Sequence, residues 1–362
     1  MGLNAEHRHM VSAWPDARFL ALVGSEHPIV QAPMAGAGGV DLCIGAIEGG
    51  GLGSLPCGML DAAQVREQAA QVRARTSGPL NLNFFSHAMP KHADDRAWRA
   101  LLAPYYAEFG VEPKSGGTTR LPFDAAMAEA VEDVRPEVAS FHFGLPEAGL
   151  LARVKGAGAV VIGNATTVAE ARWLVERGVD AVIAQGWEAG GHAGRFLGGD
   201  PDEALGLFAL LPQVADAVDV PVIAAGGIGD RRGIAAALLL GASAVQLGTA
   251  YLHCPESPIS PAHREGLAHG PTVFTNLLTG GLARGKSGRL MRELGPVRPE
   301  APPYPLAAAA LAPIRSAAEP QGEFGFGPMW AGQAGPLGRA MPAAELTRAL
   351  AAEALAILAG GA

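Results

Sequence analysis

Eight short apolar segments, separated by segments with helical periodicity, constrain the fold of this chain more than any other feature. Each is about one strand long and is bounded by Gly, Asn or Pro, which is typical of buried strands. Strands that alternate with helices in this way predict a parallel sheet, and eight such units predict an α/β fold of the (β/α)8 TIM-barrel type. A doubly wound open sheet is the alternative, because the first three units are less regular. The expected strands are residues 28–32, 51–55, 80–84, 138–142, 157–162, 179–185, 220–225 and 242–247.

Two helices in the second half of the chain carry end signals. Thr167 precedes an amphipathic run that closes at Gly178, which predicts a side-chain cap at the start and a glycine cap at the end. Asp230 opens a second helix, which ends at Gly241. These units form the most regular part of the predicted barrel.

Two segments are too long to be ordinary connections between strands and helices. Residues 85–137 carry aromatic residues among charged ones, which indicates a helical insertion. Residues 251–340 are rich in proline and glycine and are expected to form a smaller second lobe over the barrel mouth, where it would cover the substrate. The remaining residues, 1–250 and 341–362, would form the barrel, with a last helix over 343–358.

Composition and charge exclude several classes of protein. At 362 residues, of which 49% are hydrophobic and 17% charged, the chain can bury a large core. A net charge of −8 argues against nucleic-acid binding. Residues 1–14 lack the apolar stretch of a secretion signal, and the Ala-rich segment 306–312 is too short to cross a membrane. Three cysteines without metal-ligand spacing indicate a reducing compartment, so we expect a cytoplasmic protein without a metal or a membrane anchor.

A glycine-rich loop, Gln185-Gly-Trp-Glu-Ala-Gly-Gly-His192, follows the sixth predicted strand. Ligands of parallel α/β folds bind beyond the carboxyl ends of the strands, which is where this loop would lie. His192 therefore stands where chemistry usually occurs, and a structural loop histidine is the alternative. Within the loop, Glu188 is expected to face solvent, and orientation of the loop is the alternative. His142, at the end of the fourth strand, is a weaker candidate for the site.

Two further glycine loops follow the seventh and eighth predicted strands, in Ala224-Ala-Gly-Gly-Ile-Gly229 and Gln246-Leu-Gly-Thr249. In (β/α)8 barrels these two loops often bind phosphate through backbone amides and a helix N-terminus. Tight turns without a ligand are the alternative. The residues expected at the phosphate are Gly226, Gly227, Gly248 and Thr249.

Uncharged amide side chains stand at or near the ends of three other strands, at Gln31, Asn83 and Gln185. Such amides both donate and accept hydrogen bonds, which suits the carbonyls and ring nitrogens of an isoalloxazine. Together with the phosphate loops they predict a phosphorylated cofactor that lies across the barrel mouth. The alternative is that each amide bonds to neighbouring backbone.

These residues resemble the FMN-dependent nitronate monooxygenases, formerly called 2-nitropropane dioxygenases. The resemblance is carried by Gln31-Ala-Pro-Met-Ala35, the segment from Gln185 to His192, Pro221-Val-Ile-Ala-Ala-Gly-Gly-Ile228 and Gln246-Leu-Gly-Thr249, and it extends from about residue 28 to the end. It implies an FMN-binding barrel with a substrate lobe, in which His192 is catalytic. The cofactor-binding residues that it implies are Met34, Asn83, Gln185, Gly190, Gly226, Gly227, Gln246, Gly248 and Thr249.

The activity implied by this resemblance is oxidation of alkyl nitronates, such as propionate 3-nitronate, by O2 to a carbonyl compound and nitrite. His192 would act as a charged hydrogen-bond donor to the nitronate or as a neutral base toward a nitroalkane, and the sequence does not choose. The alternative function is an FMN-dependent NAD(P)H reductase of the same superfamily, of the enoyl-acyl-carrier-protein or quinone type. A homodimer is one option for the assembly.

Two features bear on the identity of the substrate. Arg284, Lys286 or Arg289 could pair with a substrate carboxylate, although solvated surface charge is the commoner role of such residues. Gly288 departs from the family pattern, in which an asparagine is expected at this position. This difference bears on the predicted identity of the substrate more than on that of the cofactor.

Overall fold

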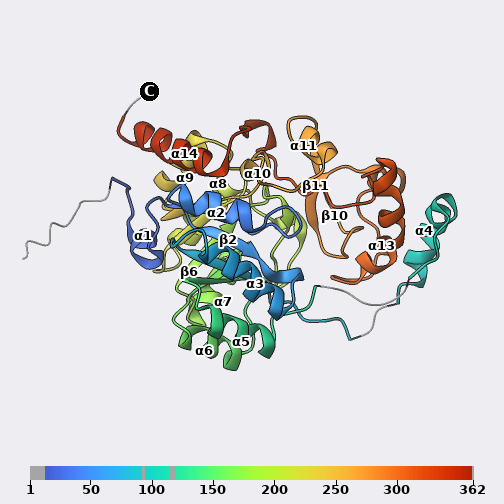
Figure 1. Cartoon of the computed structure of the whole chain (residues 1–362), viewed down its shortest axis with the longest axis horizontal. Helices are drawn as coiled ribbons and strands as arrows, with labels where there is room; N and C mark the ends of the chain where they lie inside the picture. The colour runs from blue at the N-terminus through green and yellow to red at the C-terminus, as the bar shows by residue number, and fades with distance from the viewer. Residues whose placement is uncertain (1–12, 92–93, 115–119, 361–362) are drawn as a thin grey trace, which may run out of the picture.

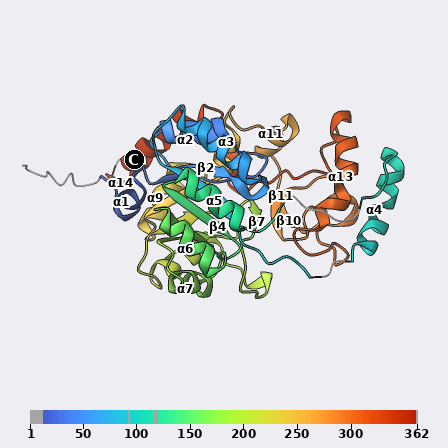
Figure 2. The ribbon, with the colours of Figure 1, turned by 60° about the horizontal axis from the view of Figure 1, so that its bottom comes forward.

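The computed structural model describes residues 13–91, 94–114 and 120–360, which form a barrel with a smaller lobe beside it (Figures 1 and 2). Eight parallel strands make one sheet in the order β1-β9-β8-β6-β5-β4-β3-β2. A parallel bridge between Val30 and Leu52 joins the two edge strands, so the sheet closes. The predicted (β/α)8 barrel is confirmed, and the open sheet is wrong. The strands are β1 (Ile29–Gln31), β2 (Gly53–Pro56), β3 (Leu80–Phe85), β4 (Val138–His142), β5 (Val160–Ala165), β6 (Ala181–Gln185), β8 (Val222–Ala225) and β9 (Ala244–Leu247).

Helices surround this barrel and bury their apolar faces against the outer side of the strands. The last helix, α14, packs against both α9 and α2, so it completes the ring as predicted. The barrel helices are α2 (Val40–Glu48), α3 (Ala62–Arg73), α5 (Ala125–Val134), α6 (Ala148–Gly156), α7 (Val168–Glu176), α8 (Leu207–Ala215), α9 (Arg231–Leu239) and α14 (Ala343–Leu358).

The predicted helix caps are present. The Thr167 side chain accepts a hydrogen bond from the backbone N–H of Glu170, and Asp230 accepts from the first turn of α9. Gly178 and Gly241 follow the two helices with φ of +81° and +101°, a backbone conformation that favours glycine. Both ends of these two helices were therefore readable from the sequence.

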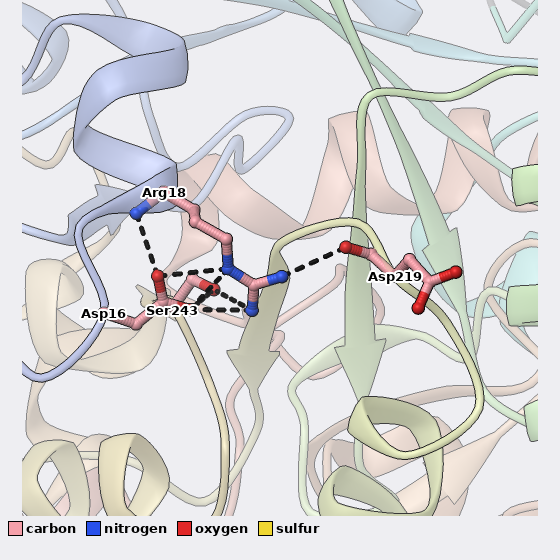
Figure 3. A network of polar contacts seen from close by, with 4 residues as sticks. All are labelled: Asp16, Arg18, Asp219 and Ser243. Carbon is pink, nitrogen blue, oxygen red and sulfur yellow. Dashed lines mark hydrogen bonds and ion pairs between the residues drawn. The ribbon is translucent and has the colours of Figure 1, made fainter.

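Helix α1 (Arg18–Val23) covers the amino end of the barrel. Its Phe19 and Val23 pack against the apolar side chains that fill the barrel interior. Arg18 donates to the backbone oxygen of Asp219 at 3.0 Å and forms an ion pair with Asp16, which also bonds Ser243 (Figure 3). Asp219 and Ser243 precede β8 and β9, so these contacts attach the N-terminal segment to the bottom of two strands.

A second lobe stands beside the carboxyl end of the barrel strands, and its core includes helix α4 (Arg96–Phe109) from the segment 85–137. Trp98 donates to the backbone oxygen of Ala307 at 3.2 Å, and the Tyr106 hydroxyl donates to that of Ala310 at 2.7 Å. Helices α4 and α13 (Ala307–Ala318) accordingly lie side by side in Figures 1 and 2, although they are far apart in the sequence.

The segment 85–137 thus serves both parts of the molecule, because its other helix, α5, packs on the barrel against α3 and α6. The predicted division of the chain into two domains stays a prediction. The short helix α10 (Thr249–Leu252) packs into the barrel core. The lobe elements are α4 (Arg96–Phe109), β7 (Gly191–His192), α11 (Pro261–Leu267), β10 (Thr272–Thr275), β11 (Ala283–Lys286), α12 (Arg289–Leu294) and α13 (Ala307–Ala318). The described ranges also contain 3-10 helices at Cys57–Met59, Pro201–Glu203, Glu319–Gln321 and Gly335–Leu337.

No helix within the described ranges is long and apolar enough to span a membrane. Residues 1–12, on which the expectation about a secretion signal depends, lie outside those ranges. The three cysteines are buried thiols, and burial raises the pKa of Cys57 to about 12. Each therefore packs as a small apolar side chain.

Candidate active site

A cavity of about 480 Å³ lies between the carboxyl ends of the barrel strands and the second lobe. Strand ends and glycine loops form its barrel side, and residues 315–334 contribute from the lobe. The resemblance implies one catalytic residue and nine cofactor-binding residues, and all ten line this cavity. They are Met34, Asn83, Gln185, Gly190, His192, Gly226, Gly227, Gln246, Gly248 and Thr249.

His192 is held by both parts of the molecule. It belongs to β7, a two-residue strand that pairs antiparallel with β11 of the lobe, with Ala283 opposite His192. Its backbone oxygen accepts from Gln185 Nε2 at 2.9 Å, and His142 Nε2 lies 3.3 Å away. The sequence placed His192 on a barrel loop, whereas the structure makes it part of the third strand of the lobe sheet.

The side chain of Gln185 organises the loop that carries His192. Its Oε1 accepts from Asn164 Nδ2 at 3.0 Å and from the backbone N–H of Gly194 at 2.9 Å. Asn164 stands at the end of β5 and also lines the cavity. Sequence reasoning missed Asn164, although it carries the same strand-end signal as Asn83 and Gln185.

The expectation for Gln31 is wrong. This side chain is fully buried and does not line the cavity, because its Oε1 accepts from the backbone N–H of Ser54 at 2.9 Å in the neighbouring strand. Its amide therefore joins β1 to β2 at the point where the barrel closes. Gln31 is therefore a strand-end amide that bonds to neighbouring backbone, which was the alternative prediction for these amides.

The imidazole of His192 lies half-buried among aromatic rings at the wall of the cavity. Its Nε2 is 2.9 Å from the hydroxyl of Thr279, and its ring packs 5.1 Å from the ring of Tyr304 and 5.5 Å from that of Trp330. Burial holds the pKa of His192 well below its usual 6.5, and the charge of Arg120 lowers it further. His192 is therefore neutral near pH 7.

His142 shares this environment. Burial lowers the pKa of His142 to about 4, although its contact with the His192 backbone raises it slightly. His142 lines the cavity as well, so the weaker sequence candidate lies within the site. Two neutral histidines thus stand side by side at the ends of β4 and β7.

Glu188 supports the loop rather than facing solvent, so that expectation is wrong. Both of its carboxylate oxygens accept from the backbone N–H of Leu207, at 2.9 and 2.8 Å. Leu207 is the first residue of α8, where a negative charge is favoured by the helix dipole. The loop from Gln185 to His192 is thereby fixed to the start of the next barrel helix.

Arg284 clamps the same loop from the lobe side. Its guanidinium donates twice to the backbone oxygen of Trp187, at 3.1 and 3.0 Å, and lies 4.2 Å from the centre of the Phe274 ring. The Phe274 ring in turn stacks on Trp187 with ring centres 4.0 Å apart. Arg284 is 5% exposed, so the interpretation as solvated surface charge is wrong for it.

The other two candidate cations are also used within the protein. Lys286 is buried and donates to the backbone oxygens of residues 269 and 270, whereas Arg289 forms ion pairs with Glu108 and Glu293. None of the three lines the cavity. The cations that do line it are Arg120 and Arg315, which sequence reasoning missed because neither belongs to a motif.

The glycine loops after β8 and β9 have the geometry that an anion requires. Gly226 and Gly227 adopt φ of +107° and +68°, which turns the backbone so that successive N–H groups can point into one concavity. The Thr249 hydroxyl accepts from the N–H of Gly332 at 2.8 Å, so its own hydrogen can be donated. The start of α9 contributes less than expected, because the Asp230 carboxylate already accepts from its first N–H groups.

Two glycines are required by close packing. A Cβ on Gly190 would lie 2.4 Å from the backbone nitrogen of Gly332, so only glycine lets the loop pass the lobe. A Cβ on Gly288 would lie 2.4 Å from the backbone oxygen of Gly325. The departure from the family pattern at Gly288 thus accompanies a tight contact within the lobe.

A family model described as nitronate monooxygenase matches residues 17–353. The chain belongs to the nitronate monooxygenase family. This family consists of flavin-dependent oxidoreductases, which agrees with the glycine loops and strand-end amides around the cavity. The resemblance seen in the sequence is thereby confirmed.

Two curated relatives match almost end to end. A nitronate monooxygenase of Paraburkholderia phytofirmans is 43% identical over 345 residues, covering 92% of this chain and 94% of the relative. One of Pseudomonas aeruginosa is 42% identical over 347 residues, covering 93% and 98%.

Two solved structures are similar as well. A nitroalkane oxidase from Streptomyces ansochromogenes superposes with a TM-score of 0.87 at 36% identity and covers 95% of this chain and 99% of that one. FabK from Thermotoga maritima has a TM-score of 0.70 at 25% identity and covers 95% and 97%. The nitroalkane oxidase is thus the more similar of the two in both structure and sequence.

Proposed function

We propose that this protein is an FMN-dependent enzyme that oxidises alkyl nitronates, such as propionate 3-nitronate, with O2 to a carbonyl compound and nitrite. The observation that carries the proposal is a neutral, half-buried His192 at the wall of a cavity lined by the residues expected around the flavin. Membership of the nitronate monooxygenase family supports the same activity.

FMN suits the donors around the cavity. The backbone amides of Gly226, Gly227 and Gly248 and the Thr249 hydroxyl would hold its phosphate, and the amides of Asn83 and Gln246 would meet the isoalloxazine. The flavin, when bound, supplies the electron acceptor for the substrate and delivers the electrons to O2. The protein positions the substrate and accepts its proton.

His192 would act in its neutral form. Thr279 engages Nε2, so Nδ1 is the nitrogen left to meet a substrate. A neutral imidazole can accept the α-proton of a nitroalkane, which produces the more readily oxidised nitronate. The packing of Tyr304 and Trp330 against the ring keeps water away and fixes the ring plane.

This role predicts the pH dependence of the reaction with a neutral nitroalkane. Because folding lowers the pKa of His192 below 6.5, the base stays deprotonated at pH 6.5 and is lost only at clearly lower pH. We expect kcat/KM to hold from pH 8 down to about 6.5 and to fall at lower pH. An acid limb centred at or above pH 7 in the steady-state profile would contradict a neutral His192.

Gly248→Ala tests the phosphate site. An added Cβ would make only ordinary contacts with the protein, 3.5 Å from Ala32 and 3.6 Å from Met34, so the fold should accept it. The methyl group would take up space in a loop proposed to hold the phosphate, and we expect FMN affinity to fall about tenfold or more, measured by flavin fluorescence. In Gly149→Ala, on the outer helix α6 with open space around it, affinity should not change. Unchanged FMN binding in Gly248→Ala would show that Gly248 is not part of the cofactor site.

The proposal is tested against the reductase alternative by anaerobic mixing. Protein loaded with FMN should lose its yellow absorbance when propionate 3-nitronate is added and keep it when NADH or NADPH is added. The reverse pattern would replace the proposal by an NAD(P)H-dependent reductase. Flavin released by heat should be FMN rather than FAD by chromatography.

A further inference from the structure

The hydroxyl of Thr279 reaches the imidazole of His192 from the lobe. Its Oγ1 lies 2.9 Å from the His192 Nε2, and Thr279 is only 2% exposed, in the connection between β10 and β11. The rings of Phe143, Tyr304 and Trp330 pack around the same imidazole, with ring centres 5.9, 5.1 and 5.5 Å from its own. The imidazole is thus bonded through Thr279 and enclosed by aromatic rings.

The position of this hydroxyl is set by the lobe backbone. The N–H of Gly280 donates to the backbone oxygen of Asn276 at 2.7 Å, which closes a turn around Thr279. Gly280 has φ of +90°, and a Cβ there would overlap the backbone oxygen of Pro302, so only glycine fits. Asn276 also bonds the backbone of Arg298 in both directions, at 2.8 and 2.9 Å. The turn is therefore held on both sides, and Thr279 has a defined place.

The partners of the Thr279 hydroxyl favour one direction for its bond to His192. The hydroxyl can donate to the backbone oxygen of Gly281 at 3.4 Å, and its lone pairs then accept from Nε2–H. When one nitrogen of a neutral imidazole carries the proton, the other keeps its lone pair, which here is Nδ1. The opposite direction, from the hydroxyl to Nε2, would place the proton on Nδ1 and leave no nitrogen to act as a base.

Protonation of His192 strengthens this contact. After Nδ1 takes up a proton, both ring nitrogens donate, and a hydrogen bond from a charged donor is stronger than one from a neutral donor. Arg120, His142 and His87 all act against the protonated form, as does burial of the ring. The Thr279 oxygen acts in the other direction, because it accepts from the positively charged ring.

We propose that Thr279 is a positioning residue that accepts a hydrogen bond from Nε2–H of His192 and so keeps Nδ1 unprotonated as the base. The inference rests on the proposed function. In the step that it serves, the C–H bond of a nitroalkane breaks, its electron pair moves into the nitro group to form the nitronate, and the proton goes to Nδ1. Thr279 should therefore matter for a neutral nitroalkane and little for a nitronate, which has already lost that proton.

Matched substrates test the role of the hydroxyl. Thr279→Val replaces the hydroxyl by a methyl group of similar size, and kcat for nitroethane should fall about 10- to 100-fold, the usual contribution of a hydrogen bond to a charged group. The kcat for ethyl nitronate should stay within about threefold. Thr279→Ser, which keeps the hydroxyl, should restore most of the activity toward nitroethane.

Thr275→Val is the matched control. Thr275 is fully buried in the same lobe, and its hydroxyl accepts from the backbone N–H of Leu277 at 3.1 Å. It does not line the cavity, so this variant loses a buried hydrogen bond of the lobe without touching His192. We expect a lower melting temperature and an unchanged ratio of the two kcat values, which separates positioning from a loss of stability.

A spectroscopic measurement reads the tautomer directly and needs no turnover. The protein is loaded with FMN and labelled with 15N-histidine, and the signals of His192 are assigned by their absence in His192→Asn. We expect wild type and Thr279→Ser to show the neutral Nε2–H form at pH 8, and Thr279→Val to show a mixture of both tautomers. A wild-type ring protonated on Nδ1 would overturn the inference.

The outcomes differ for the two proposals. If wild type is active and Thr279→Val lowers kcat equally for nitroethane and ethyl nitronate, the role of Thr279 as a positioning residue is wrong. Failure of Thr279→Ser to restore activity toward nitroethane would also contradict it. If wild type oxidises neither compound, the proposed function fails, and the spectrum still decides whether Thr279 sets the tautomer of His192.

Discussion

His192→Asn is expected to lower the kcat for nitroalkane oxidation about 10²- to 10⁴-fold, the usual contribution of a general base. Asparagine keeps a polar group near Thr279 and cannot accept a proton near neutral pH. The backbone of residue 192 pairs with Ala283 and accepts from Gln185 whatever its side chain, so the loop should keep its shape. FMN should therefore remain bound while turnover is lost.

His269→Asn is the matched control for this variant. His269 is exposed and does not line the cavity, so its replacement should leave both flavin content and turnover unchanged. The measurement is kcat with nitroethane for wild type and both variants, each normalised to bound FMN. Full activity in His192→Asn would show that His192 takes no part in the chemistry.

Glu170→Ala is expected to give the largest loss of stability, about 3–5 kcal/mol, because it leaves two buried and two half-buried donors without an acceptor. The fully buried Glu170 carboxylate accepts from the N–H and hydroxyl of Thr166 at 2.7 and 2.8 Å. Its other oxygen accepts from the backbone N–H groups of Phe196 and Leu197 at 2.7 and 3.2 Å. It therefore holds the chain just beyond His192 against helix α7.

The loss should appear as a melting temperature lower by roughly 5–10 °C and as a reduced kcat, since the chain after His192 is released. Glu176→Ala, on the same helix with a side chain 73% exposed, should change stability by less than about 0.5 kcal/mol. A Glu170→Ala protein as stable and as active as the Glu176→Ala protein would show that this carboxylate does not support the loop.

The barrel could be predicted because its signals are local. Each strand is a short apolar run, and caps such as Thr167 and Asp230 mark helix starts within three or four residues. The glycines after β8 and β9 signal backbone conformations that other residues rarely adopt, so Gly226 and Gly227 indicated the site from the sequence alone. All of this information is contained within single βα units.

The remaining half of the site depends on contacts between distant segments. Nothing in the sequence near Thr279 or Tyr304 shows that they meet His192, because they arrive with the lobe and lie more than 80 residues away. The same reason made Arg284 look like a surface charge, when it is in fact buried against Trp187. Gln31 gave the opposite error, because it was expected at the ligand and instead bonds the neighbouring strand where the barrel closes. A strand-end amide can serve either purpose, and the sequence does not distinguish between them.

The most direct test of the account is oxygen consumption by the FMN-loaded protein after addition of propionate 3-nitronate, with no nicotinamide present. We predict rapid uptake of O2 accompanied by release of nitrite, and loss of both in His192→Asn when a neutral nitroalkane replaces the nitronate. No uptake by a protein that demonstrably contains flavin would contradict nitronate oxidation and favour an NAD(P)H-dependent reductase.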